Sequence, residues 1–182
     1  MKEYAAKEKR EIEKINELLE HLTYYSHPVS LATQNTDILK LLNETIGMLK
    51  SQLNQRKIAV ATDFQDEKNL QLKVDPSQLR QALSNVITNA IEAMPSGGKI
   101  FIGTEEEEGY FRITIRDTGH GITKEDMTKI FDPFFSRKEG HTHTGLGLAV
   151  TRGIIENHQG KIRVKSERGF GTDFVIELPL TS

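Results

Sequence analysis

The sequence predicts an α+β fold: a helical lead, then one mixed β-sheet with helices on a single face. Apolar residues recur every three or four positions from residue 2 to about residue 25 and again from about residue 37 to residue 56, which is the helical period. After Arg56 they alternate with polar residues, and strand-like and helix-like stretches then succeed one another. Such an order of elements is typical of a sheet that buries one face under helices.

The length and composition are those of one domain with an appendage. The chain has 182 residues, 36% of them hydrophobic, and a net charge of −2, which suggests neither nucleic acid nor a membrane surface as a partner. The absence of cysteine excludes disulfides and thiolate metal sites. No apolar run approaches the roughly 20 residues that span a bilayer. We therefore expect these residues to be cytoplasmic and free of membrane contact, whether or not a parent protein is membrane-anchored.

Residues 1–28 are predicted to form a helix that ends at Pro28. Its apolar seam is only about two heptads long and consists of Ile12, Ile15, Leu19 and Leu22. A helix with so short a seam is not stable alone, so it should pack against a partner helix, either in a second chain as a homodimer or in a missing segment. The charged, helical start suggests a piece of a longer chain.

The remaining elements follow from hydrophobic period and turn residues. We predict helices over 37–56, 76–94, 124–130 and 146–157, and strands over 57–64, 70–74, 99–104, 110–117, 161–166 and 172–180. The four glutamates at 105–108 are predicted to form a turn. Asp75 should cap the helix that begins at Pro76, with Gln78 completing a capping box.

The predicted helix over 76–94 carries an unusual polar face. Gln81, Asn85, Asn89 and Glu92 follow one another at spacings of four, four and three. Asparagine inside a helix costs about 0.5 kcal/mol relative to alanine. Two amide oxygens one turn apart can hold a hard cation that is shared with phosphates, as magnesium usually is. The alternative is a polar edge that happens to contain asparagines, and this helix alone does not decide between the two.

Two polar side chains fall on the inward face of predicted strands. Asp117 is in phase with the apolar residues of its strand, and Thr172 does the same on the last strand. A buried carboxylate needs a donor, either in a core salt bridge or on a ligand such as a base amino group. For Thr172 the alternative is an ordinary strand threonine. Gly119 and Gly121 would let the backbone pass close to something flat.

The stretch over residues 131–150 has three parts. Phe131, Phe134 and Phe135 are predicted to pin it against the core. Residues 136–144 contain no aliphatic or aromatic side chain, so we expect them to be mobile until a charged ligand arrives. From Thr144 onward a glycine-containing turn opens a helix, whose first N–H groups would form an anion site.

Taken in order, these motifs resemble those of the ATP-binding catalytic domain of bacterial sensor histidine kinases, within the gyrase, Hsp90, histidine kinase and MutL superfamily. The resemblance covers about residues 57–179. The five matching motifs are Asn85-Val-Ile-Thr-Asn89-Ala90, Asp117-Thr-Gly119-His-Gly121, Phe131-Asp-Pro-Phe-Phe135, Thr144-Gly-Leu-Gly-Leu148 and Gly169-Phe-Gly171-Thr172. Five matches in the family's order are far more specific than any one of them.

The resemblance implies a Bergerat-type fold, a two-layer α/β sandwich, over residues 29–182, with residues 136–144 as a lid over ATP. It implies that Asp117 accepts from the adenine amino group and that Thr172 supports the base. It also implies that Asn89, aided by Asn85, holds magnesium against the phosphates. The implied phosphate contacts are Arg137 or Lys138 and the turn made of Thr144, Gly145, Leu146, Gly147 and Leu148, and the implied nucleotide-binding glycines are Gly119 and Gly121.

Two departures shape the functional prediction. The superfamily's hydrolases typically have a glutamate base at the position of Asn85, and an amide cannot take a proton. The family's phosphoacceptor histidine motif is absent from the sequence, and residues 1–28 look like the second helix of the family's dimerisation and phosphotransfer hairpin. We therefore expect transfer of the ATP γ-phosphate to a histidine outside this chain, with an acceptor hairpin and a response regulator as partners. The alternatives are a non-catalytic nucleotide-binding or protein-interaction module and a slow ATPase.

Overall fold

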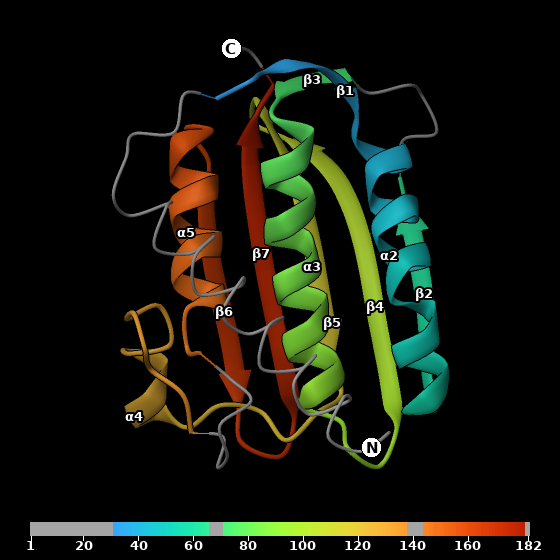
Figure 1. The fold of residues 1–182 in the computed structure, drawn as a ribbon, viewed down its shortest axis with the longest axis vertical. Coiled ribbons are helices and arrows are strands. Elements are labelled where there is room, and N and C mark those ends of the chain that lie inside the picture. Colours follow the sequence, from blue (N-terminus) through green and yellow to red (C-terminus); the bar gives the residue numbers. More distant parts are fainter. Residues whose placement is uncertain (1–30, 66–70, 138–143, 181–182) are drawn as a thin grey trace, which may run out of the picture.

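The computed structural model describes residues 31–65, 71–137 and 144–180. Its main sheet has five strands in the order β2-β4-β5-β7-β6, and β2 and β4 are parallel whereas the other neighbours are antiparallel. The strands are β2 (Ile58–Phe64), β4 (Gly98–Glu107), β5 (Tyr110–Asp117), β6 (Lys161–Glu167) and β7 (Gly171–Pro179). The helices α2 (Ile38–Gln55), α3 (Pro76–Glu92) and α5 (Gly147–Asn157) lie side by side over one face of it (Figure 1). The predicted two-layer α+β architecture, a mixed sheet with helices on one face, is confirmed.

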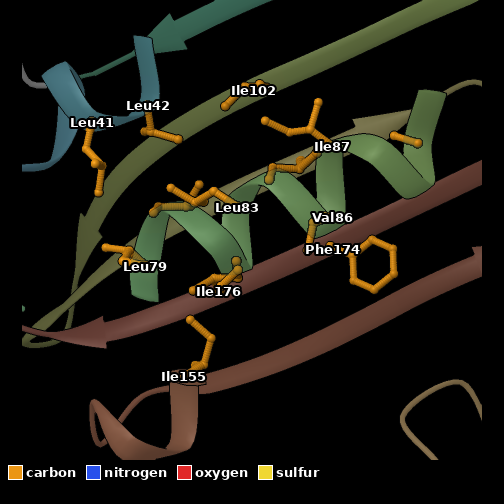
Figure 2. Packing of buried hydrophobic residues seen from close by; sticks show 14 of the residues in the cluster. Leu41, Leu42, Leu79, Leu83, Val86, Ile87, Ile102, Ile155, Phe174 and Ile176 are labelled. Carbon is orange, nitrogen blue, oxygen red and sulfur yellow. The ribbon is translucent and has the colours of Figure 1, made fainter. Parts of the chain in front are cut away.

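Helix α3 lies at the centre of the core. Apolar side chains at helical spacing point from it toward the sheet, and Figure 2 shows Leu83 and Ile87 facing Ile102 of β4 and Leu79 near Ile176 of β7. Seven residues of α3 are buried: Leu79, Ala82, Leu83, Val86, Ile87, Ala90 and Ile91. Because the apolar stripe occupies one face of the helix, the asparagine-bearing face is turned away from the centre of the core.

The first turn of α3 is capped by the residue before it, which is tied to the end of α5. As predicted, the Asp75 side chain caps it, because Oδ1 accepts from the Ser77 and Gln78 N–H groups at 3.0 and 3.1 Å. The predicted capping box does not form, since the Asp75 N–H donates to Nε2 of buried His158 at 2.9 Å and the Gln78 Oε1 atom has no partner among the described residues. His158 therefore joins the end of α5 to the start of α3.

The prediction of a single sheet is wrong for the strand at 70–74. The strand β3 (Gln71–Val74) pairs antiparallel with β1 (Gln34–Asp37) in a separate two-stranded sheet. Strand β1 has no apolar residue, so its sequence carries no strand period, and only backbone pairing with β3 defines it. Asp37 ends β1 and caps α2, because its Oδ1 accepts from the Lys40 N–H at 2.9 Å.

The predicted acidic turn at 105–108 is also wrong. The strand β4 runs on to Glu107, and only Glu108 and Gly109, both with positive φ, make the turn into β5. The reason is Arg112 on β5, whose guanidinium pairs with Glu105 at 2.7 Å and also with Glu107. This cross-strand cation removes the repulsion that the glutamates would exert in a strand.

The aromatic anchor is only partly as predicted. Phe131 and Phe135 pack against the core, but Phe134 is 68% exposed and has a φ of 66°. A Cβ on Gly145 would lie 2.6 Å from the carbonyl carbon of Phe134, so it is the backbone of Phe134 that packs closely, against the glycine turn. The helix before the anchor, α4 (Lys124–Met127), is shorter than the predicted 124–130.

Two predictions fall outside the described residues. The helical lead over 1–28 is one, so the division at residue 28 stays a prediction, and most of the proposed lid is the other. Within residues 31–65, 71–137 and 144–180, no helix is both long and apolar enough to cross a membrane.

Candidate functional site

A cavity of about 890 Å³ opens between α3, the loop after β5, the α4 segment and the start of α5. Its volume is in the range of pockets that hold a nucleotide-sized ligand. Ten of the predicted site residues line it: Asn85, Asn89, Asp117, Gly121, Arg137, Thr144, Gly145, Gly147, Leu148 and Thr172. Gly119 and Leu146 do not line it, and Lys138 lies outside the described residues.

Asp117 is the most buried of the polar residues that line the cavity. Only 3% of the residue is exposed, and its Oδ1 accepts from the Gly119 N–H at 2.7 Å while the Thr172 N–H also donates to the carboxylate. The carboxylate is therefore held by backbone donors, and the core salt bridge considered from the sequence is not what holds it. Burial raises its pKa above the ordinary value, and the two N–H groups oppose this rise.

The raised pKa of Asp117 predicts the sign of a pH effect on stability. From pH 3.8, its ordinary pKa, up to the raised value, the unfolded chain has lost a proton that the folded chain keeps. The contribution of Asp117 to the free energy of unfolding therefore falls as the pH rises through this window, and stays low above it.

Urea unfolding from about pH 3.5 to about pH 7, with Asp117→Asn as the variant that cannot titrate, measures this contribution. The free energy of unfolding of the wild type minus that of the variant is expected to decrease with pH. An increase would mean that the N–H donors outweigh burial.

The glycines around Asp117 allow neighbouring segments of the chain to lie very close to the backbone. A Cβ on Gly121 would overlap the Glu167 carbonyl, and one on Gly171 would overlap the carbonyl of Asp117 itself. Both glycines have positive φ, 68° and 92°. A Cβ on Gly119 would instead meet the Ala93 Cβ at 2.7 Å and an oxygen of the Asp117 carboxylate at 2.8 Å. These glycines thus admit close neighbours from within the chain, and the approach of a flat ligand stays a prediction.

The two asparagines of α3 differ in their surroundings. The Asn85 Nδ2 group donates to the Gly147 carbonyl at 3.0 Å and to Thr151 Oγ1 at 3.3 Å, which ties α3 to the first turn of α5. The amide oxygen is thus the atom that Asn85 can offer to the cavity. Asn89 and Glu92 line the same wall one and two turns further on.

The oxygen donors on α3 fit magnesium. Among the described residues there is no cluster of three or more histidine, aspartate or glutamate side chains that could hold a metal alone. Magnesium bound with a nucleotide takes only one or two protein oxygens and completes its octahedron with phosphate and water. Asn85 and Asn89 can supply such oxygens, so the donor set suits a cation that arrives with phosphates.

The start of α5 offers backbone donors to the cavity. Among the described residues no side chain caps this helix, and Gly147 and Leu148 of its first turn line the cavity. The first N–H groups of a helix have no carbonyl partner within the helix and carry its positive dipole end, which suits an anion. Leu146, which directly precedes this turn, is buried, with 2% of the residue exposed.

Arg137 lies at the rim and is paired with an acid that the sequence did not point to. Its Nε and Nη2 atoms lie 2.9 and 2.8 Å from Oδ1 of Asp126 in α4, and this guanidinium lowers the pKa of the Asp126 carboxyl. Sequence reasoning missed Asp126 because an acid in the first turn of a helix has an ordinary role at the dipole. Other polar lining residues to which the sequence reasoning assigned no role include Thr88, His120, Thr123 and Arg168.

Comparison with known proteins assigns this site to a family. The family model described as "Histidine kinase-, DNA gyrase B-, and HSP90-like ATPase" matches residues 74–182, more than half of the chain. Among curated proteins, sporulation kinase A of Bacillus subtilis (strain 168) is 36% identical over 170 residues, and sensor histidine kinase ZraS of Escherichia coli (strain K12) is 34% identical over 172 residues. The matches cover 93% and 94% of this chain but only 28% and 36% of those two relatives.

Solved structures agree with the family match. The nucleotide-free catalytic domain of histidine kinase ThkA superposes with a TM-score of 0.74 at 32% identity, over 82% of this chain and 96% of that one. A second ThkA structure, in complex with the response regulator protein TrrA, gives a TM-score of 0.79 at 29% identity over 95% of this chain and 49% of that one. The resemblance drawn from the five motifs is confirmed, and the chain belongs to the histidine kinase-, DNA gyrase B- and HSP90-like ATPase family.

Proposed function

We propose that this chain is the ATP-binding catalytic part of a sensor histidine kinase, and that it transfers the ATP γ-phosphate to a histidine on a separate acceptor hairpin. The observation that carries the proposal is the buried Asp117 carboxylate, held by two backbone N–H groups at the wall of a cavity whose other side has amide oxygens and helix N–H donors. This arrangement suits a ligand with an amino group at one end and phosphates at the other.

In this proposal each wall binds a different part of ATP. Asp117 accepts a hydrogen bond from the adenine amino group, and Thr172 supports the base from the neighbouring strand. The first turn of α5, at Gly147 and Leu148, donates to the phosphates, with Arg137 or Lys138 adding positive charge. Asn89 and Asn85 hold magnesium, which when bound neutralises charge on the phosphates.

The reaction is an in-line displacement at the γ-phosphorus. A nitrogen of the acceptor imidazole forms a bond to phosphorus, the bond to the bridging oxygen of ADP breaks, and the imidazole proton is released to solvent. The chain's residues position the reactants and stabilise charge. Asn85 cannot act as a base, and a neutral imidazole needs less help than water or a hydroxyl, so its amide favours histidine phosphorylation over hydrolysis.

The partners follow from the same proposal. The relatives include sporulation and sensor kinases, and ThkA has been solved with its response regulator. We therefore propose a phosphoacceptor hairpin and a response regulator as partners, with residues 1–28 pairing two chains in a homodimer. The supply of ATP places the reaction in the cytoplasm.

Two measurements test the proposed function. Calorimetric titration with an ATP analogue and magnesium should show binding to this chain. Addition of ATP and a cognate acceptor hairpin should then yield a phosphoprotein that is labile in acid and stable in base, as phosphohistidine is. A hairpin with its histidine replaced by alanine is the control and should stay unlabelled.

The outcomes separate the alternatives. An absence of ATP binding would favour a non-catalytic interaction module. Phosphate release without any hairpin that disappears in Asn89→Ala would favour a slow ATPase and contradict the argument from Asn85. Binding of ATP without transfer to any of several cognate hairpins would contradict the proposed kinase activity in trans.

A further inference from the structure

Ser166, on the edge strand β6, lies beside the cavity wall. It is the register partner of Thr172 on β7, and unlike Thr172 it does not line the cavity. Its hydroxyl oxygen lies 2.7 Å from the Gly171 carbonyl, 2.8 Å from the Ile122 N–H nitrogen and 3.0 Å from Thr172 Oγ1. One serine thus connects the loop that follows Gly121 with the turn that leads into β7.

The direction of each of these hydrogen bonds can be worked out by counting protons. A serine hydroxyl has one hydrogen to donate and two lone pairs that accept. The Gly171 carbonyl can only accept, so it takes the Ser166 hydrogen, and the Ile122 N–H can only donate, so it takes one lone pair. The contact with Thr172 therefore uses the second lone pair, with Thr172 as the donor. All three bonding positions of Ser166 are then filled.

This count determines what Thr172 offers to a ligand. Its single hydroxyl hydrogen points away from the cavity, toward Ser166, so the side facing the cavity carries only lone pairs. Thr172 is 4% exposed and its Asp117 neighbour is also an acceptor, so this part of the wall presents acceptors side by side.

We propose that Ser166 is a positioning residue that sets the base specificity of the site by holding the Thr172 hydroxyl as an acceptor, so that the wall selects a 6-aminopurine over a 6-oxopurine. The inference rests on the proposed nucleotide-binding function. An exocyclic amino group can donate hydrogen bonds to the Asp117 carboxylate and the Thr172 hydroxyl oxygen. A 6-oxo group would instead place its lone pairs opposite the lone pairs of these two acceptors, which is repulsive. Ser166 reaches the base only through Thr172.

Competitive titration of ATP and inosine triphosphate, whose base carries a 6-oxo group and a proton on N1, tests the proposal. The wild-type chain is expected to bind ATP more tightly. In Ser166→Ala the Thr172 hydroxyl is free to turn and donate into the cavity. The ratio of the dissociation constant for inosine triphosphate to that for ATP should therefore fall by about tenfold, the value of one hydrogen bond. Ser166→Thr keeps the hydroxyl, so its ratio should stay within about twofold of the wild-type ratio.

A double-mutant cycle shows whether Ser166 acts through Thr172. In a Thr172→Val background, Ser166→Ala is expected to leave the ratio unchanged, because no hydroxyl remains to be oriented. Thr45→Val is the matched control: it removes another buried hydroxyl, bonded at 2.7 Å to the Leu41 carbonyl in α2, and should lower stability without changing the ratio. Ser166→Cys, with a similar volume but a weak acceptor, provides the second test if the alanine variant does not fold.

The ratio distinguishes positioning from a purely structural role. If Ser166 only stabilises the loops, its loss weakens both nucleotides equally, and an unchanged ratio in Ser166→Ala would overturn the inference while leaving ATP binding intact. A wild-type chain that binds both nucleotides equally well would overturn it too. Failure of the wild type to bind either nucleotide would overturn the proposed function itself.

Discussion

Asp117→Asn is expected to weaken ATP binding by about 100-fold or more, with little effect on the fold. The carboxylate accepts from the Gly119 and Thr172 N–H groups and, in the proposed complex, from the adenine amino group. An asparagine replaces one acceptor oxygen with an NH₂ donor, so that donors face donors in a buried site. The loss combines a charge-assisted hydrogen bond with an unsatisfied polar group, together about 3 kcal/mol or more.

The matched control is Asp173→Asn, at the residue of β7 that follows Thr172. Asp173 pairs with Arg116 at 2.7 Å on the open face of the sheet, where the Arg116 side chain is 59% exposed. Its replacement is expected to change ATP affinity by no more than about twofold, since exposed pairs contribute little. Calorimetric titration of both variants gives the comparison, and equal losses would show that Asp117 has no specific contact with the nucleotide.

Gly171→Ala is expected to lower the free energy of unfolding by about 3 kcal/mol, from overpacking and backbone strain together. At a φ of 92° an added Cβ would overlap the carbonyl of Asp117 and lie 3.2 Å from the Cα of Thr118. Neither neighbour can move aside, because both are backbone atoms at the end of β5. The same overlap would displace Thr172, so nucleotide binding should fall as well.

Gly169→Ala, two residues earlier, separates the two costs. Its φ is 87°, close to that of Gly171, but a Cβ there meets nothing within 4 Å. Only the strain of placing an alanine at positive φ remains, so the free energy of unfolding is expected to fall by about 1 kcal/mol. Urea unfolding of both variants measures the difference, and equal destabilisation would mean that the contact with Asp117 is relieved by a small backbone shift.

Local patterns predicted most of the elements and several of the site residues. The alternation along β5 places Asp117 on the buried face, as its 3% exposure shows, and the apolar stripe of α3 leaves its asparagines on the cavity side. These inferences succeeded because period and phase within one element depend on that element's own residues.

The errors have a common cause. Strand β1 has no apolar residue and exists through its pairing with β3, while the glutamates of β4 stay in the strand because Arg112 lies opposite. Gln78 loses its capping-box bond because His158, far along the chain, accepts from the Asp75 N–H instead. In each case the deciding partner comes from another element, which no local pattern contains.

The sequence alone determined the family of this protein and the residues proposed to carry its chemistry, because the types and order of its motifs, from Asn85 to Thr172, do not depend on packing. Only the tertiary structure decided how those residues act together. It paired Arg137 with Asp126, turned the Asn85 amide nitrogen toward α5, and brought Ser166 within hydrogen-bonding distance of Thr172. Hydrogen bonds have a direction and a short reach, so the group that each polar atom offers to a ligand depends on partners that folding brings within about 3 Å.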